Sequence, residues 1–159
     1  MTEWTHLDQE GRPRMVDVGD KPVTRRRALA EARIELGVEV LEKLLDDALP
    51  KGNALAVATV AGVQAAKRTG DTVPLCHPLP LEHVRVEFES DRMTGSVRVI
   101  CETATTARTG VEMEALCGVT GAALALYDMC KALHRGIRIE SVRLLLKEGG
   151  KSGRWEADS

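Results

Sequence analysis

The segment ALYDMCKAL, residues 125–133, places an acid and a base three positions apart in an apolar helical pattern. Residues at this spacing share one helix face, so Asp128 and Lys131 can form an ion pair or act together on a proton. We expect that face to be mostly buried, where a charge is costly unless it is paired or used. An ordinary helix salt bridge is the structural alternative, and the spacing does not exclude it.

A second acid on the same predicted helix indicates where a site could form. Glu114 and Asp128 are fourteen residues apart, which places them within about 40° of one helix face and about 21 Å apart along the axis. Both side chains therefore cannot touch one small substrate from a single chain. If they serve the same site, two subunits must contribute to it.

The segment PLCHPL, residues 74–79, holds His77 in a loop bracketed by prolines. A histidine in such a loop can be a catalyst or a packed, hydrogen-bonded loop residue. His77 and His83 have too few other ligands around them to predict a metal site. Basic residues that could together hold phosphates are found along the chain, although each is more often solvated: Lys21, Arg25, Arg26, Arg27, Lys51, Lys67 and Arg68.

The tail sequence GGKS, residues 149–152, resembles the end of a phosphate-binding P-loop but fails the pattern. Leu145 stands where the first glycine would be required, and no helix follows. Lys147 and Lys151 could still donate to an anion, but a solvated tail, mobile from about residue 148, is the simpler prediction.

The composition describes one globular domain over residues 1–159, with 43% hydrophobic and 29% charged residues. A net charge of -2 and only 3% aromatic residues argue against nucleic-acid and membrane partners. The first twenty residues lack the apolar core of a signal peptide, and no apolar run reaches the length of a membrane span. Four widely spaced cysteines without a C-x-x-C pair favour reduced thiols in the cytoplasm.

The first half of the chain predicts two strands and two helices. Residues 15–18 read as a short strand, and residues 27–36 alternate apolar and charged side chains, which favours a strand despite their helix propensity. An amphipathic helix follows from Val38 and stops by Pro50. Asn53 is placed to cap a second helix over residues 54–69.

The second half begins with a proline-containing loop over residues 70–83. Alternation over residues 84–101 predicts a hairpin, the apolar stretch 112–134 predicts a long helix, and residues 137–146 predict a last strand. The long helix is apolar nearly all round, so it should face the sheet on one side and another surface, such as a subunit interface, on the other. With the adjacent helices counted as one crossover, the order is that of an α+β ferredoxin-like fold, an antiparallel sheet with helices on one face.

Seven segments together resemble the cyclic pyranopterin monophosphate synthase family of molybdenum cofactor biosynthesis. They occur in order between residues 15 and 153: MVDV, KGN, VAGVQAAKRT, PLCHPL, TGVEMEAL, LYDMCKAL and VRLLLKEGGKSG. The resemblance implies a lyase that converts a cyclic dihydro-GTP intermediate, supplied by an upstream radical enzyme, to cyclic pyranopterin monophosphate with loss of pyrophosphate. It also implies a homohexamer, a trimer of dimers with active sites between subunits.

The resemblance also implies roles for individual residues. Asp128 and Lys131 match the central catalytic pair. The positions that match substrate-binding or site-lining residues of the family are Leu75, Cys76, His77, Met113, Glu114, Glu112, Lys51, Lys67, Lys147, Lys21 and Arg26. Among these we expect Lys51, Lys67 and Arg26 to hold the triphosphate, and His77, Glu112 and Glu114 to bind the base or move protons.

No motif requires a cofactor, although magnesium could accompany a triphosphate. Two alternatives remain open at the level of sequence. One is a non-catalytic oligomer that binds a nucleotide or pterin, with Asp128 and Lys131 as a structural pair. The other is a scaffold for neighbouring enzymes.

Overall fold

The computed structural model describes residues 7–8 and 10–158, and its elements follow the ferredoxin-like order. Strand β1 (Thr24–Glu35) is followed by helices α1 (Val38–Leu45), α2 (Ala54–Lys67) and the short α3 (Thr69–Thr72). The hairpin of β2 (His83–Asp91) and β3 (Ser96–Ala107) precedes α4 (Glu112–Cys130), β4 (Arg138–Glu148) and the short β5 (Trp155–Glu156). The predicted α+β fold is confirmed.

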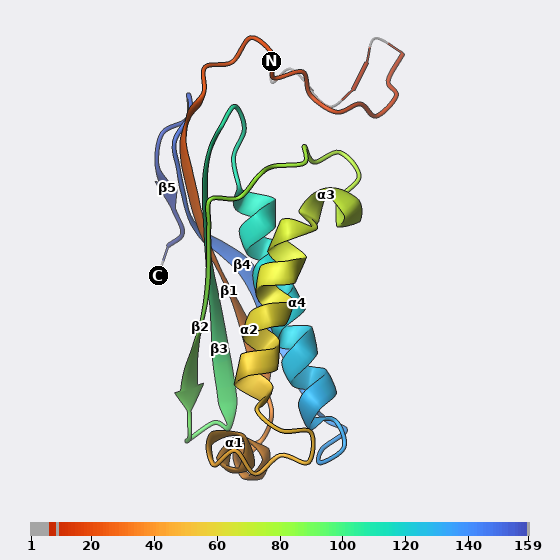
Figure 1. Ribbon diagram of the computed structural model, residues 1–159, viewed down its shortest axis with the longest axis vertical. Helices are drawn as coiled ribbons and strands as arrows, with labels where there is room; N and C mark the ends of the chain where they lie inside the picture. The colour runs from red at the N-terminus through yellow and green to blue at the C-terminus, as the bar shows by residue number, and fades with distance from the viewer. Residues whose placement is uncertain (1–6, 9, 159) are drawn as a thin grey trace.

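The sheet is antiparallel throughout, in the order β2-β3-β1-β4-β5. Strand β1 lies between β3 and β4, and its residues Ala28, Ala30, Ala32 and Ile34 are fully buried. The alternation over residues 27–36 therefore predicted the correct face, because a strand can bury one side only if its side chains alternate with period two. Figure 1 shows α2 and α4 lying together over that one side of the sheet.

Small residues let α2 and α4 approach each other and the sheet closely. A Cβ on Gly62 would lie 3.0 Å from the Gly118 carbonyl oxygen, and one on Gly118 would lie 2.5 Å from Cys101 Sγ. A Cβ on Gly121 would overlap Ala65 of α2. The glycine- and alanine-rich composition of both helices is explained by this packing, which larger side chains would force apart.

The opposite face of the sheet carries ion pairs rather than a second apolar layer. The Arg27 guanidinium lies 3.0 Å from Glu102 and 3.1 Å from Glu148, and Arg143 lies 2.6 Å from Glu31. Within the described residues, all four helices lie on the other side or at the end of the sheet, where α1 closes the core with Val40, Leu41 and Leu44 (Figure 1). The functional residues must therefore be sought on the helical side and at the sheet's ends.

Three details differ from the sequence predictions. Residues 15–18 form no strand, because no described strand pairs with them. The long helix ends at Cys130 rather than residue 134, since the chain tightens into a turn in which the Leu133 amide donates to the Cys130 carbonyl at 2.9 Å. The short α3 occupies the start of the predicted loop.

The tail has more regular structure than its composition predicts. After a glycine turn, Trp155 and Glu156 pair with Lys147 and Leu146 of β4. The Ala157 amide also donates to the Leu145 carbonyl at 2.9 Å. Backbone pairing with β4 thus orders a segment whose side chains alone offer little to bury.

The prediction that no apolar run reaches the length of a membrane span is wrong for α4, which has that length and mean hydropathy, but half of that stretch is buried inside the protein. It packs against α2 and against strands β1, β3 and β4. A helix in a protein core can have the same length and hydropathy as a membrane span, and the contacts of α4 with the sheet and α2 are those of a core helix.

Candidate active site

Most of the residues matched to substrate binding surround one cavity of about 330 Å³, here called the loop pocket. Its walls come from three places: the segment 16–21, the loop 75–79 and the residues that begin α4. The lining residues are Val16, Val18, Lys21, Leu75, Cys76, His77, Leu79, Thr109, Gly110, Glu112, Met113 and Glu114. The structure thus brings together seven predicted site residues: Lys21, Leu75, Cys76, His77, Glu112, Met113 and Glu114.

Two buried threonines of β3 hold the walls of the loop pocket. The Thr103 hydroxyl donates to the Val111 carbonyl oxygen at 3.0 Å, which fixes the start of α4. The Thr105 hydroxyl donates to the Pro80 carbonyl oxygen at 2.6 Å, which fixes the end of the PLCHPL loop. Both face the helices from one strand, so the rigid sheet sets the distance between the two walls.

Of the two acids that line the loop pocket, only Glu114 is buried. The residue is 4% exposed to solvent. Burial raises the pKa of Glu114 to about 7, and the neighbouring Glu112 carboxylate acts in the same direction. Glu114 can therefore donate or accept a proton near neutral pH, which a surface glutamate does poorly.

Cys76 and His77 lie half-buried in the same wall. Burial raises the pKa of the Cys76 thiol, and the Glu114 carboxylate adds to this effect. The thiol is therefore protonated at neutral pH and is suited to contact rather than nucleophilic attack.

Asp128, Lys131 and Lys51 form a second group, here called the lysine–aspartate cluster, at the opposite end of α4. Lys131 Nζ lies 2.7 Å from Asp128 Oδ1, and Lys51 Nζ lies 2.9 Å from Oδ2. Lys51 also donates to the Asp128 carbonyl oxygen at 2.9 Å. Lys131 and Lys51 together lower the pKa of Asp128 to about 2, and Asp128 raises that of Lys131.

The KGN motif explains the position of Lys51. Gly52 adopts a left-handed backbone at φ 86°, and the Asn53 side chain caps α2 by accepting from the Ala56 amide at 2.8 Å. The chain therefore turns sharply just before α2, and Lys51 is carried to the end of α4.

The prediction that Asp128 and Lys131 share a mostly buried surface is wrong for the single chain. Each side chain is 55% exposed. The reason is that the sheet and α2 cover only part of the circumference of α4, and these two residues lie on the uncovered part. The charges are instead satisfied by each other and by Lys51.

The lysine–aspartate cluster and the loop pocket are separate sites within one chain. They occupy the two ends of α4, a helix of 19 residues, and Figure 1 shows how far that helix separates the loop beside α3 from the turn beside α1. The predicted separation of Glu114 and Asp128 along one helix is therefore confirmed.

The sequence model of the MoaC family matches residues 15–150. The chain belongs to the MoaC family. The resemblance inferred from the seven motifs is thereby confirmed.

Three full-length relatives carry the same name, cyclic pyranopterin monophosphate synthase. The protein of Desulforapulum autotrophicum is 50% identical over 158 residues, covering 99% of this chain and 97% of its own. That of Chloroflexus aurantiacus is 49% identical over 154 residues, with 97% and 94% covered. That of Roseiflexus sp. is 48% identical over 158 residues, with 99% and 100% covered.

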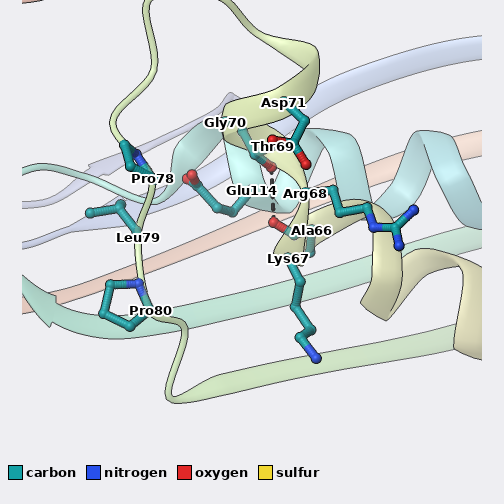
Figure 2. A pocket seen from close by; sticks show the side chains of 10 residues that line it. All are labelled: Ala66, Lys67, Arg68, Thr69, Gly70, Asp71, Pro78, Leu79, Pro80 and Glu114. Atoms are coloured by element: carbon teal, nitrogen blue, oxygen red, sulfur yellow. Dashed lines mark hydrogen bonds between the residues drawn. The ribbon is translucent and has the colours of Figure 1, made fainter.

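Lys67, matched to the MoaC family site from sequence, lies outside the loop pocket. It borders a second cavity of about 310 Å³ between the end of α2, α3 and residues 78–80. Figure 2 shows Glu114 reaching into this cavity, while the charged ends of Lys67 and Arg68 extend away from Glu114. Glu114 and Leu79 line both cavities, so they form the partition between them.

Arg26 and Lys147, also matched from the MoaC family, lie together at the tail turn. Cβ atoms on Gly149 and Gly150 would overlap the Arg25 carbonyl and the Arg26 guanidinium, so the turn packs directly on Arg26. Arg26 Nη2 donates to the Arg108 carbonyl oxygen at 3.3 Å, and Lys147 Nζ to Ser152 Oγ. These two cations thus lie beside the tail that the sequence predicted to be solvated. Neither lines the loop pocket, although Arg26 contacts Arg108, the neighbour of the lining residue Thr109.

Several residues of the loop pocket were missed by sequence reasoning. Val16 and Val18 were assigned to a strand, and Thr109 and Gly110 carry no obvious chemistry. Thr103 and Thr105 lie beyond the predicted hairpin, which ended at residue 101, whereas β3 continues to Ala107. The available signal was their position: two hydroxyls at period two on the buried side of a strand require partners.

Proposed function

We propose that this chain catalyses the synthesis of cyclic pyranopterin monophosphate, as a lyase of molybdenum cofactor biosynthesis. The proposal rests on one observation: the chain is 50% and 49% identical, over nearly its full length, to two proteins of that name. It also has side chains that can transfer protons at the matching positions. The substrate in this proposal is the cyclic dihydro-GTP intermediate delivered by an upstream radical enzyme, and pyrophosphate is the second product.

The loop pocket suits the base of such a substrate. Glu112 and Glu114 supply carboxylates that can accept from N–H groups, and His77 adds a ring that can donate or accept. An anionic triphosphate would be repelled by these two acids. The phosphates should instead bind to cations outside these acids. The candidates are Lys51, Lys131, Arg26 and Lys147, together with Lys21, which lines the loop pocket, and Lys67, which lines the second cavity.

The lysine–aspartate cluster supplies the proton chemistry. Because the pKa of Asp128 is about 2, its carboxylate is ionised at neutral pH and is a weak base, which is suited to orienting the ammonium groups of Lys131 and Lys51. Lys131 and Lys51 can donate a proton or hold a phosphate oxygen that becomes more charged as pyrophosphate leaves.

A complete site requires two chains. The uncovered face of α2 and α4, between the loop pocket and the lysine–aspartate cluster, is apolar, with Val60 69%, Leu124 56%, Val57 45% and Met113 37% exposed. A patch of this kind marks an interface. Two copies packed antiparallel on this face about a twofold axis would bring the cluster of one to the loop pocket of the other. The homohexamer, a trimer of such dimers, is part of the proposal, as are a cytoplasmic location and magnesium bound with the triphosphate.

The test adds purified protein to the product of the upstream enzyme and measures pyrophosphate and fluorescent pterin. Asp128→Asn and Lys131→Ala should each lose about 10²–10⁴-fold in turnover, as removal of a proton-transfer group does. Both residues are exposed, so the melting temperature should change little. Near-normal turnover in either variant contradicts its catalytic role.

The same experiment separates the alternatives. A nucleotide- or pterin-binding module would bind the substrate without releasing pyrophosphate, and a scaffold would do neither. Fold alone could not decide among them, because this architecture serves many functions.

A further inference from the structure

Gly110 lies in the wall of the loop pocket, directly before Val111, the N-cap residue of α4. Its backbone does not explain why it is glycine. Its φ lies outside the left-handed range in which other residues are strained, unlike seven other glycines of the described chain. The backbone of the next residue, Val111, is fixed because its carbonyl oxygen accepts from the Thr103 hydroxyl, so Gly110 is not needed as a flexible hinge.

The explanation lies in the space beside its Cα. A Cβ on Gly110 would lie 2.6 Å from Glu112 Cδ and 2.7 Å from Oε1, and closer still to Oε2. All three nearest atoms belong to one carboxylate. Glu112 therefore folds back over Gly110 and fills the volume that any other side chain would occupy.

Packing, rather than a bonded partner, places this carboxylate. In the described part of the chain Glu112 takes part in no salt bridge and no side-chain hydrogen bond, and no side chain caps the start of α4. The Glu112 side chain is half-buried and lines the loop pocket. Its position thus depends on the space that Gly110 leaves open.

We propose that Gly110 is a positioning residue, which holds the Glu112 carboxylate in the loop pocket by leaving room for it. The proposal rests on the proposed function, in which Glu112 contacts the base of the substrate. Since the displaced group is the end of a flexible side chain, adding a methyl group at residue 110 should move the carboxylate and leave the fold intact.

The experiment uses Gly110→Ala, Glu112→Ala and the double variant in the full-length oligomer. Crystal structures of wild type and Gly110→Ala should show the Glu112 carboxylate displaced from its place over residue 110. Gly110→Ala should raise KM for the cyclic dihydro-GTP substrate about tenfold or more, with a smaller change in kcat, since a hydrogen bond to a charged group is lost. In the Glu112→Ala background the added methyl group should have no further effect.

The control is Glu87→Ala, which removes an exposed carboxyl of β2 on the face of the sheet that carries the ion pairs. This variant should keep the KM of wild type. If Gly110→Ala folds poorly, the double variant should fold as well as Glu112→Ala, because no carboxylate remains to be displaced.

The proposal is overturned if the Glu112 carboxylate has not moved in Gly110→Ala. It is also overturned if the effects of Gly110→Ala and Glu112→Ala on KM simply add in the double variant. A wild-type protein that forms no product overturns the proposed function instead. In that case the two crystal structures still decide whether Gly110 places Glu112.

Discussion

At the scale of single residues, two of the three acids of α4, Asp128 and Glu114, illustrate opposite ways to tune a carboxyl group. Asp128 is exposed, and two ammonium groups keep it ionised. Glu114 is buried, and desolvation favours its neutral form. One helix thus carries an acid that is always charged and an acid that changes charge near pH 7.

Glu114 should leave a signature in the pH dependence of stability. Its pKa in the folded protein, about 7, exceeds its usual value of 4.5. The native state therefore binds more protons than the unfolded state between these values. The free energy of unfolding should fall as pH rises across this window, by at most about 1.4 kcal/mol per pH unit from this group.

Glu114→Gln should remove this decline, which urea unfolding from pH 4.5 to 8 at fixed protein concentration would measure. Glu87→Gln removes an exposed carboxyl and should leave the decline in place. An unchanged slope in Glu114→Gln would show that Glu114 is not held neutral by burial.

At the scale of elements, strand β3 connects the fold to the site. Its inner residues change along the strand from Val97 and Val99, which pack the core, to Thr103 and Thr105, which hold the pocket walls. The same strand therefore serves packing at one end and positioning at the other.

Thr103→Val should both destabilise the protein and loosen the loop pocket. The Val111 carbonyl would lose its buried partner, which costs about 1–3 kcal/mol. KM should rise while the sheet stays intact. Thr106→Val, on the exposed side of the same strand, is the matched control for denaturant unfolding and steady-state kinetics. Equal stability of the two variants would argue against the anchoring role.

At the scale of the whole molecule, the separation of the two sites along α4 predicts complementation between inactive subunits. A dimer of Asp128→Asn and Glu114→Gln chains would hold one site with both defects and one with neither. Random mixing should then restore about a quarter of wild-type turnover, because half of the dimers are mixed and each has one intact site. Each variant alone should be nearly inactive.

Mixing the two variants after mild dissociation and measuring pyrophosphate release tests this arrangement. Asp128→Asn mixed with Lys131→Ala is the control, since both defects lie in one cluster and no intact site can form. Failure of the first mixture, with mixed oligomers verified by mass, would mean that one chain supplies the whole site.

The sequence by itself determined the period of the four long strands, the cap at Asn53, the ferredoxin-like order and the family, because these depend on local spacing and on motifs. Only the tertiary structure decided which residues meet. It placed Lys51 on Asp128, separated Lys67 from the loop pocket, buried Glu114 and exposed Asp128. The physical reason is that burial and contact depend on which surfaces the packed elements cover, and no local pattern encodes that.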